Sequence, residues 1–223
     1  MFGMEILGSY GLLDCSMEQM QIIKSIKTIL VTNTRSFSDN NSVAADLAVM
    51  IAKSGKRVAL IDANLRRPIL HKMFRLPNQL GLSDILHNHR SPLSVLHERE
   101  NNNLSILTSG GHTISSFEIF NSEKMHESLR ILKDEFDRII IHGPPFFFTE
   151  AASIATQVDG VVLLIHPGYN KTETSRAIID KFQRSGAAVI GIVMREQPKN
   201  QAKQSAFIDR LLTFDKHARQ YSR

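Results

Sequence analysis

Residues 57–68 read Arg-Val-Ala-Leu-Ile-Asp-Ala-Asn-Leu-Arg-Arg-Pro. The stretch begins as a continuous apolar run and then turns polar at Asp62 and Asn64, with Arg66 and Arg67 directly after them. A short continuous apolar run is typical of a strand that is covered on both faces. In open α/β sheets, ligands bind beyond the carboxyl ends of such strands. The stretch therefore predicts a buried strand that presents a polar site at the edge of a sheet.

Similar apolar runs alternate with helical patterns along the chain. Strands are predicted over Thr28–Thr32, Arg57–Ile61, Leu104–Leu107, Arg138–Ile141, Gly160–Ile165 and Ala188–Val193, and helices over Asn40–Ser54, Pro92–Glu98, Ser122–Phe136, Thr149–Thr156 and Lys171–Ser185. This alternation indicates βαβ units and a mostly parallel, doubly wound sheet flanked by helices. We expect one α/β domain over residues 21–197. A loosely ordered segment (1–20) precedes it, and a basic tail with a short helix (198–223) follows it.

The amino-acid composition excludes several classes of protein. The chain has 223 residues, 42% of them hydrophobic, which is enough for a sizeable core and excludes a wholly disordered chain. The longest apolar run, Gly160–Ile165, is too short to span a bilayer, and a single cysteine fits a reducing compartment. We therefore expect a cytoplasmic protein, peripheral at the inner membrane if its partner lies there. The net charge is +5, and the basic tail fits either a solubilising segment or a contact with an anionic partner.

Three motifs carry a resemblance to a known family. They are Asp62-Ala-Asn-Leu-Arg-Arg-Pro68, Gly81-Leu-Ser83 and His142-Gly-Pro-Pro145. With their flanking strands they resemble the cytoplasmic domain of the bacterial protein-tyrosine kinases of capsular and exopolysaccharide synthesis. That family belongs to the deviant Walker-A, MinD/ParA-like ATPases. The resemblance covers about residues 28–196 and implies a P-loop NTPase-like fold.

The phosphate-binding loop that the resemblance implies is degenerate. Phe37 and Asp39 stand at its glycine positions, where glycines let backbone N–H groups turn toward an anion. Asn40 stands in place of the lysine that neutralises phosphate, and Asn41 in place of the hydroxyl that holds magnesium. Asp39 is also a good N-cap for the following helix. Our hypothesis is that this carboxylate occupies the anion site that a phosphate would use.

Two further positions depart from the family pattern. Asn64 replaces the second aspartate of an Asp-x-Asp pair, and His142 replaces the aspartate that helps to hold Mg²⁺. A neutral imidazole is a poor ligand for this hard cation. We therefore expect a vestigial pocket with no catalytic residue, no cofactor and no metal, in which Asp62 alone is retained.

Four residues are candidates for partner binding. Glu18 begins a short sequence that weakly resembles the family's self-association motif. The alternative is that this sequence is part of an ordinary amphipathic helix. Arg66 and Arg67 can bind an acidic surface or form structural ion pairs. Phe147 belongs to a run of three phenylalanines that can be an exposed patch or part of the core.

Three functions compete at this point. The first is an inactive, kinase-like scaffold or regulator of polysaccharide synthesis or export, and not an enzyme. Its partner would be an inner-membrane chain-length or export protein, an active kinase paralogue or a second copy. The second is an atypical ATP- and magnesium-dependent kinase or ATPase that uses Asp62 and His142. The third is a partition-like protein that binds DNA through its tail, with an affinity that falls steeply with salt.

Overall fold

The computed structural model describes residues 26–34, 42–88, 90–98, 103–111, 117–165 and 186–194, together with residues 180, 182 and 184. Its strands are β1 (Thr28–Asn33), β2 (Val58–Asp62), β3 (His97–Glu98), β4 (Leu104–Leu107), β5 (Arg138–His142), β6 (Gly160–Ile165) and β7 (Val189–Met194). Its helices are α2 (Ser42–Lys53), α3 (Leu70–Phe74), α4 (Leu82–Asn88), the 3₁₀ helix η1 (Pro92–Val95), α5 (Phe117–Phe120), α6 (Glu123–Glu135) and α7 (Thr149–Ala155).

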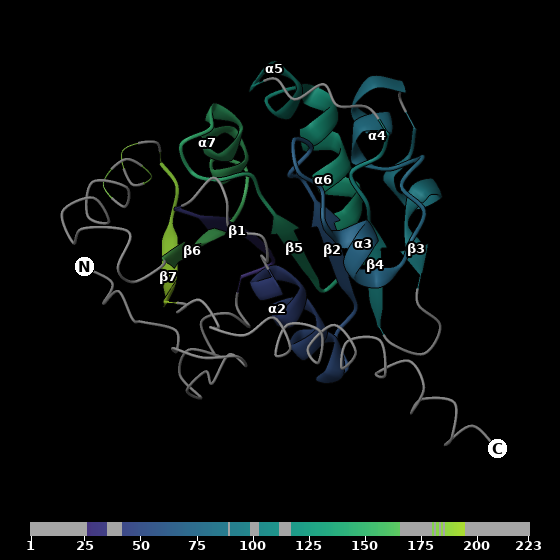
Figure 1. Ribbon diagram of the computed structural model, residues 1–223, viewed down its shortest axis with the longest axis horizontal. Helices are drawn as coiled ribbons and strands as arrows, with labels where there is room; N and C mark the ends of the chain where they lie inside the picture. Colours follow the sequence, from purple (N-terminus) through teal and green to yellow (C-terminus); the bar gives the residue numbers. More distant parts are fainter. Residues whose placement is uncertain are drawn as a thin grey trace.

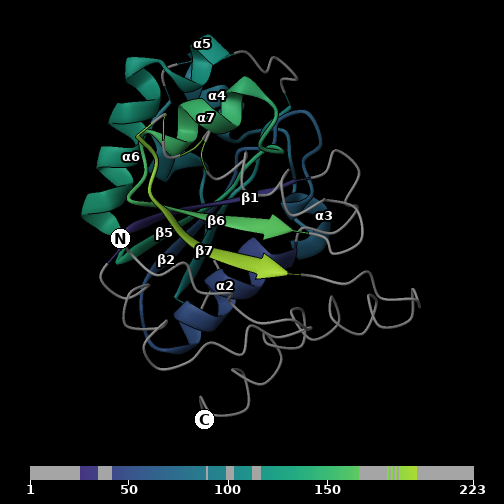
Figure 2. The same cartoon turned by 90° about the vertical axis from the view of Figure 1, so that its left-hand side faces the viewer.

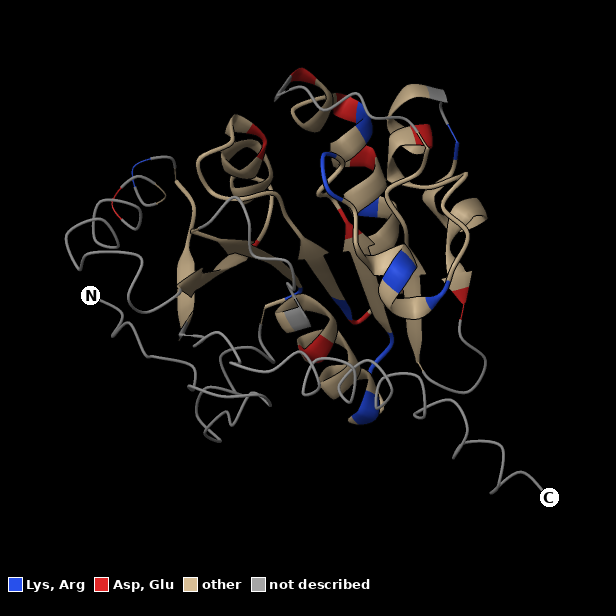
Figure 3. Ribbon diagram, in the orientation of Figure 1, with Lys and Arg blue, Asp and Glu red and all other residues tan. Residues whose placement is uncertain are grey.

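The strands form one sheet in the order β3-β4-β2-β5-β1-β6-β7. All neighbours pair in parallel except β3, which is antiparallel to β4. The central strands carry continuous apolar runs, and β1, β6 and β7 carry no charged residue (Figure 3). Helices cover both faces of the sheet (Figures 1 and 2). The predicted doubly wound, mostly parallel α/β fold is therefore confirmed.

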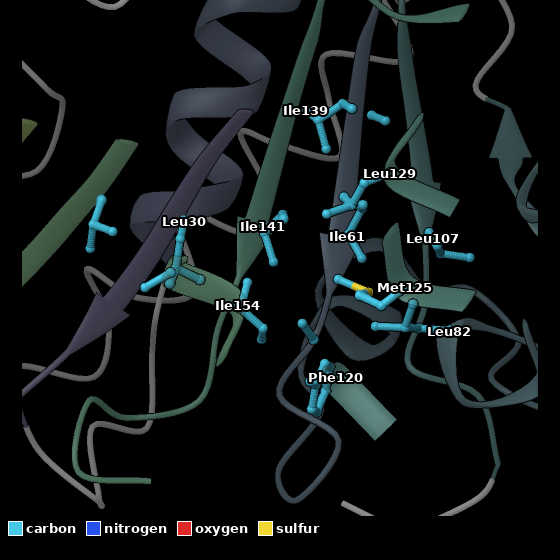
Figure 4. Close-up of a cluster of buried hydrophobic side chains, with 14 of the residues drawn as sticks. Leu30, Ile61, Leu82, Leu107, Phe120, Met125, Leu129, Ile139, Ile141 and Ile154 are labelled. Atoms are coloured by element: carbon cyan, nitrogen blue, oxygen red, sulfur yellow. The ribbon is translucent and has the colours of Figure 1, made fainter. Parts of the chain in front are cut away.

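Alternate residues of each strand build two separate cores. Ile29 and Val31 of β1 pack under α2 and α3, whereas Leu30 points to the opposite face. That opposite face is covered by α4, α5, α6 and α7, and Figure 4 shows Met125 and Leu129 of α6 beside Ile61 of β2. This alternation is the two-residue period of a strand. It fixes which side chains at each strand end face α2 and which face α7.

The residues at their ends explain where α2 and α6 stop and start. α2 places small residues such as Ala44 and Ala48, both fully buried, against the sheet and ends before Gly55, whose φ is +86°. α6 is capped by Ser122, whose side chain accepts a hydrogen bond from the backbone N–H of Met125. None of the helices in the described part of the chain has the length and apolar character that a membrane-spanning segment needs.

The predicted helix over 92–98 is wrong. The chain forms the 3₁₀ helix η1 and then the two-residue strand β3. Pro92 starts η1, but Leu96 has extended backbone angles (φ −70°, ψ 136°), so the helix stops there and the chain joins the edge of the sheet. The predicted helix 171–185 lies mostly outside the described residues. The domain limits 21–197 and the two flanking segments stay predictions.

Candidate functional site

Asp62 and His142 meet at the carboxyl ends of β2 and β5. They are direct neighbours in the parallel register of these strands. Both side chains face α2, because Leu60 and Ile140, two residues earlier in each strand, pack in the core under that helix. Asp62 is 0% exposed and His142 is 1% exposed. Two residues predicted to share a pocket are therefore in direct contact.

The Asp62 carboxylate is fully engaged within the chain. Its Oδ1 lies 3.3 Å from the backbone N of Asn64 and 3.0 Å from His142 Nδ1. Its Oδ2 accepts hydrogen bonds from the backbone N–H groups of Ile69 and Leu70, both at 2.9 Å. These two N–H groups open α3, so the carboxylate meets donors that the helix itself cannot satisfy. An ionised carboxylate offers about four acceptor sites, and this one uses four.

His142 is oriented by this carboxylate through one ring nitrogen. A carboxylate only accepts, so the ring proton is assigned to Nδ1, which donates to Asp62. The backbone carbonyl of His142 also accepts a hydrogen bond from the N–H of Ala63 at 2.9 Å. The other ring nitrogen, Nε2, is buried and has no hydrogen-bond partner among the described residues.

Mg²⁺ does not fit this set of donor atoms. Mg²⁺ prefers oxygen ligands and is usually held by one or two carboxylates together with waters. Here the oxygens of Asp62 are taken by N–H donors, and His142 offers nitrogen. The described part of the chain also contains no group of three or more His, Cys, Asp or Glu side chains that could hold a metal. The arrangement is a closed hydrogen-bond network that joins β2, β5 and α3.

Asn64 closes the turn that follows β2. It is 8% exposed, and its side-chain Oδ1 accepts from the backbone N–H of Arg67 at 3.3 Å. Its backbone carbonyl accepts from the same N–H at 3.1 Å. The residue therefore shapes the loop that leads into α3.

Arg66 forms the structural ion pair that was one of its two predicted roles. Its Nη2 and Nε lie 2.8 and 3.2 Å from Oε1 of Glu150, which is 2% exposed. Its guanidinium also lies over the ring of Phe148, 4.9 Å from the centroid. Phe147 is 42% exposed, whereas Phe146 packs against the core, so the phenylalanine run divides between surface and interior.

Two residues of the site have no counterpart in the sequence-based prediction. Glu150, at the start of α7, anchors Arg66, and an acidic residue in the first turn of the predicted helix Thr149–Thr156 is the only sequence signal that points to it. His71, in α3, lies close enough to Asp62 for the two charges to interact. Burial lowers the pKa of His71, and Lys72 acts in the same sense, while Asp62 opposes them.

The remaining predicted residues lie outside the described part of the chain. They are Glu18, Phe37, Asp39, Asn40 and Asn41. The degenerate phosphate loop and the self-association motif therefore stay sequence-based predictions.

Comparison with known proteins assigns the family, although no family profile matches the chain. The tyrosine-protein kinase ptk of Acinetobacter johnsonii is 32% identical over 162 residues, which are 72% of this chain and 22% of ptk. CapB of Staphylococcus aureus, named as a tyrosine-protein kinase, is 30% identical over 174 residues, which are 78% of this chain and 76% of CapB. The chain belongs to the bacterial tyrosine-protein kinase family. It spans most of CapB but only about a fifth of ptk.

Solved structures confirm the fold of this family member. The kinase domain of VpsO aligns with a TM-score of 0.74 at 24% identity, over 80% of this chain and 89% of that domain. The cell division ATPase MinD of Pyrococcus furiosus aligns with a TM-score of 0.64 at 18% identity, over 81% of this chain and 79% of MinD. The predicted likeness to the MinD-like P-loop NTPases is therefore confirmed at the level of fold.

Proposed function

We propose that this kinase relative is a catalytically inactive scaffold or regulator that does not bind nucleotide and acts in bacterial exopolysaccharide or capsule synthesis or export. One observation carries the proposal. Asp62, the aspartate retained from the family pattern, has both oxygens committed to His142 and to three backbone N–H groups. A general base must reach the proton that it removes, and a metal ligand must offer a lone pair. Asp62 can do neither while this network is intact.

The sequence supports the same conclusion at the phosphate loop. A Mg-nucleotide needs glycines, a lysine and a hydroxyl there, and the chain has Phe37, Asp39, Asn40 and Asn41. A carboxylate at Asp39 would repel a phosphate. At 4 Å and an effective dielectric constant near 20, the cost is about 4 kcal/mol per unit charge.

The partner follows from the family resemblance. It is the inner-membrane chain-length or export protein of a polysaccharide pathway or an active kinase paralogue, with self-association through the segment around Glu18 as the third arrangement. The chain would then work in the cytoplasm, at the inner membrane. It would provide a surface that binds other proteins and would not catalyse a reaction.

Thermal unfolding with and without millimolar Mg-ATP or Mg-ADP tests the proposal. A ligand at about 100 times its Kd adds about 2.7 kcal/mol of stability, which would raise the midpoint by roughly 5–10 °C for a domain of this size. We expect no shift for this chain and a clear shift for CapB measured alongside. A shift of that size in this chain would overturn the proposal.

A second function is favoured by Nε2 of His142, which has no hydrogen-bond partner among the described residues. An imidazole held by a carboxylate through Nδ1 is an arrangement that general bases use. An atypical ATPase or kinase built on this pair would hydrolyse Mg-ATP. It would lose that activity in Asp62→Ala and His142→Gln but keep it in His126→Gln, which changes an exposed histidine on α6.

A further inference from the structure

Residues 66–75, the basic segment, carry four basic side chains and no acidic one. It contains Arg66, Arg67, Lys72 and Arg75, all of them exposed. No Asp or Glu occurs between Asp62 and Asp84, and α3 carries positive and no negative charge (Figure 3). Lys72 lies on α3 and Arg75 directly follows the last residue of that helix, so the two cations lie close together in the chain. The segment contributes four positive charges in a chain whose net charge is +5.

The basic segment is held rigidly. The inner side of α3 is buried through Leu70, Met73 and Phe74. Its first N–H groups are fixed by Asp62, and Asn64 closes the turn before it. A surface that is already ordered loses little conformational entropy when a partner binds. The hydrogen bonds of Asp62 and Asn64 that close the vestigial pocket therefore also hold the basic segment in place.

Arg75 adopts a backbone conformation that its side chain does not favour. Its φ and ψ are 53° and 48°, the left-handed region that glycine enters without steric cost. A cation at the end of a helix interacts favourably with the helix dipole, but α3 has only five residues. Neither Lys72 nor Arg75 forms an ion pair within the described part of the chain. The strained backbone at Arg75 has no counterpart benefit among the described contacts of the fold, which points to a role outside the fold.

The chemistry of the neighbouring loops favours a protein as the partner. Arg66 is held by Glu150 and Phe148 and still has 46% of its side chain exposed. The ring of Phe147 contacts that of Phe148 and is 42% exposed. Arginine and phenylalanine are enriched in protein–protein interfaces. Carboxylates on the partner would meet the guanidinium groups in charge-assisted hydrogen bonds.

We infer that the basic segment docks an acidic segment of a partner protein, with Lys72 and Arg75 as its main charge contacts. The inference rests on the proposed scaffold role, since it names the chemistry through which such a scaffold would hold its partner.

Fluorescence anisotropy with a labelled peptide of alternating Glu and Ala tests this docking surface, with a Lys–Ala peptide as the control for charge. We expect the full chain to bind the acidic peptide, and Lys72→Glu combined with Arg75→Glu to weaken binding about tenfold or more. The matched control is Lys124→Glu combined with Arg130→Glu on α6, which changes the net charge equally and should keep most of the affinity. Arg75→Gly should weaken binding and also raise the midpoint of thermal unfolding, so that loss of binding cannot be attributed to misfolding.

Each other outcome overturns the inference. Equal losses in both double variants would mean that only the net charge matters. Binding to phosphatidylglycerol-containing vesicles but not to the acidic peptide, lost only in the Lys72/Arg75 variant, would assign the surface to lipid. Absence of peptide binding in a chain that also ignores Mg-ATP would reject the docking surface while leaving the inactive pocket standing.

Discussion

His142 places an imidazole, and not a second carboxylate, beside Asp62. Aspartate at this position would place a second carboxylate against Asp62 Oδ1, which now lies 3.0 Å from His142 Nδ1. Like charges about 4 Å apart repel by about 4 kcal/mol at an effective dielectric constant near 20, and side-chain movement relieves part of this. We expect His142→Asp to reduce the free energy of unfolding by about 2–4 kcal/mol at neutral pH, and part of the loss to be recovered in acid.

Urea unfolding at neutral and mildly acidic pH measures this effect. His142→Asn is the matched control, because it removes the imidazole without adding charge. An aspartate variant as stable as the asparagine variant at neutral pH would contradict the proposed closeness of the two side chains.

His71 makes the free energy of unfolding depend on pH, and the direction of its pKa shift gives the sign. Burial is the largest cause that lowers its pKa from the usual 6.5. The unfolded chain therefore takes up a proton near that pH before the folded chain does, and the folded state loses stability as the pH falls through 6.5 toward the lower pKa. We expect His71→Gln to flatten this part of the stability curve between about pH 8 and about pH 5, measured by urea unfolding. The exposed His126→Gln should leave the slope as it is.

The Arg66–Glu150 pair connects two elements, the loop after β2 and the first turn of α7. Removing the arginine would leave a carboxylate that is 2% exposed without its cation. Breaking a fully buried pair costs about 3–5 kcal/mol, and the partial exposure of Arg66 reduces the cost to about 2 kcal/mol. We expect this loss for Arg66→Met in chemical unfolding and a smaller one for the neighbouring Arg67→Met. Equal effects would show that the pair adds nothing specific.

Of the seven strands in the described part of the chain, all but the edge strand β3 could be predicted from sequence, whereas several helices could not. Each predicted strand agrees with an observed one to within about one residue at either end, because a continuous apolar run is a strong local signal. α3, α4 and α5 were missed. They span only four to seven residues and have little periodicity, and α3 depends on the distant carboxylate of Asp62 for its start. Tertiary contacts decide these elements.

At the scale of the whole molecule, Asp159 connects distant parts of the chain. It accepts from the backbone N–H groups of Thr28 and Lys27 at 2.8 and 3.1 Å, and Lys133 lies 3.5 Å away. Burial would raise the pKa of Asp159, but these hydrogen bonds and the lysine outweigh it, and the pKa lies below the usual 3.8. The contribution to stability is therefore present above that pH and is lost as the pH falls further.

We expect Asp159→Asn to lower the free energy of unfolding by about 1 kcal/mol at neutral pH, since one acceptor oxygen and one charge are lost. The two proteins should converge in stability below about pH 3. Acid titration followed by circular dichroism measures this, and a difference that persists unchanged in acid would contradict the assignment.

The site could be predicted in part. That Asp62 and His142 share one edge of the sheet follows from strand ends and parallel topology. That Asp62 bonds α3, and that Arg66 is held by Glu150, depends on side-chain directions in loops that no periodicity encodes. The sequence alone therefore placed Asp62 and His142 together but did not predict the hydrogen-bond network around them.

The contact between His142 and Asp62 also limits how position 142 can change in evolution. An aspartate there would place two carboxylates side by side with no cation between them. Such a substitution would cost stability at once, so it would be tolerated only together with a second change that separates or neutralises the two charges.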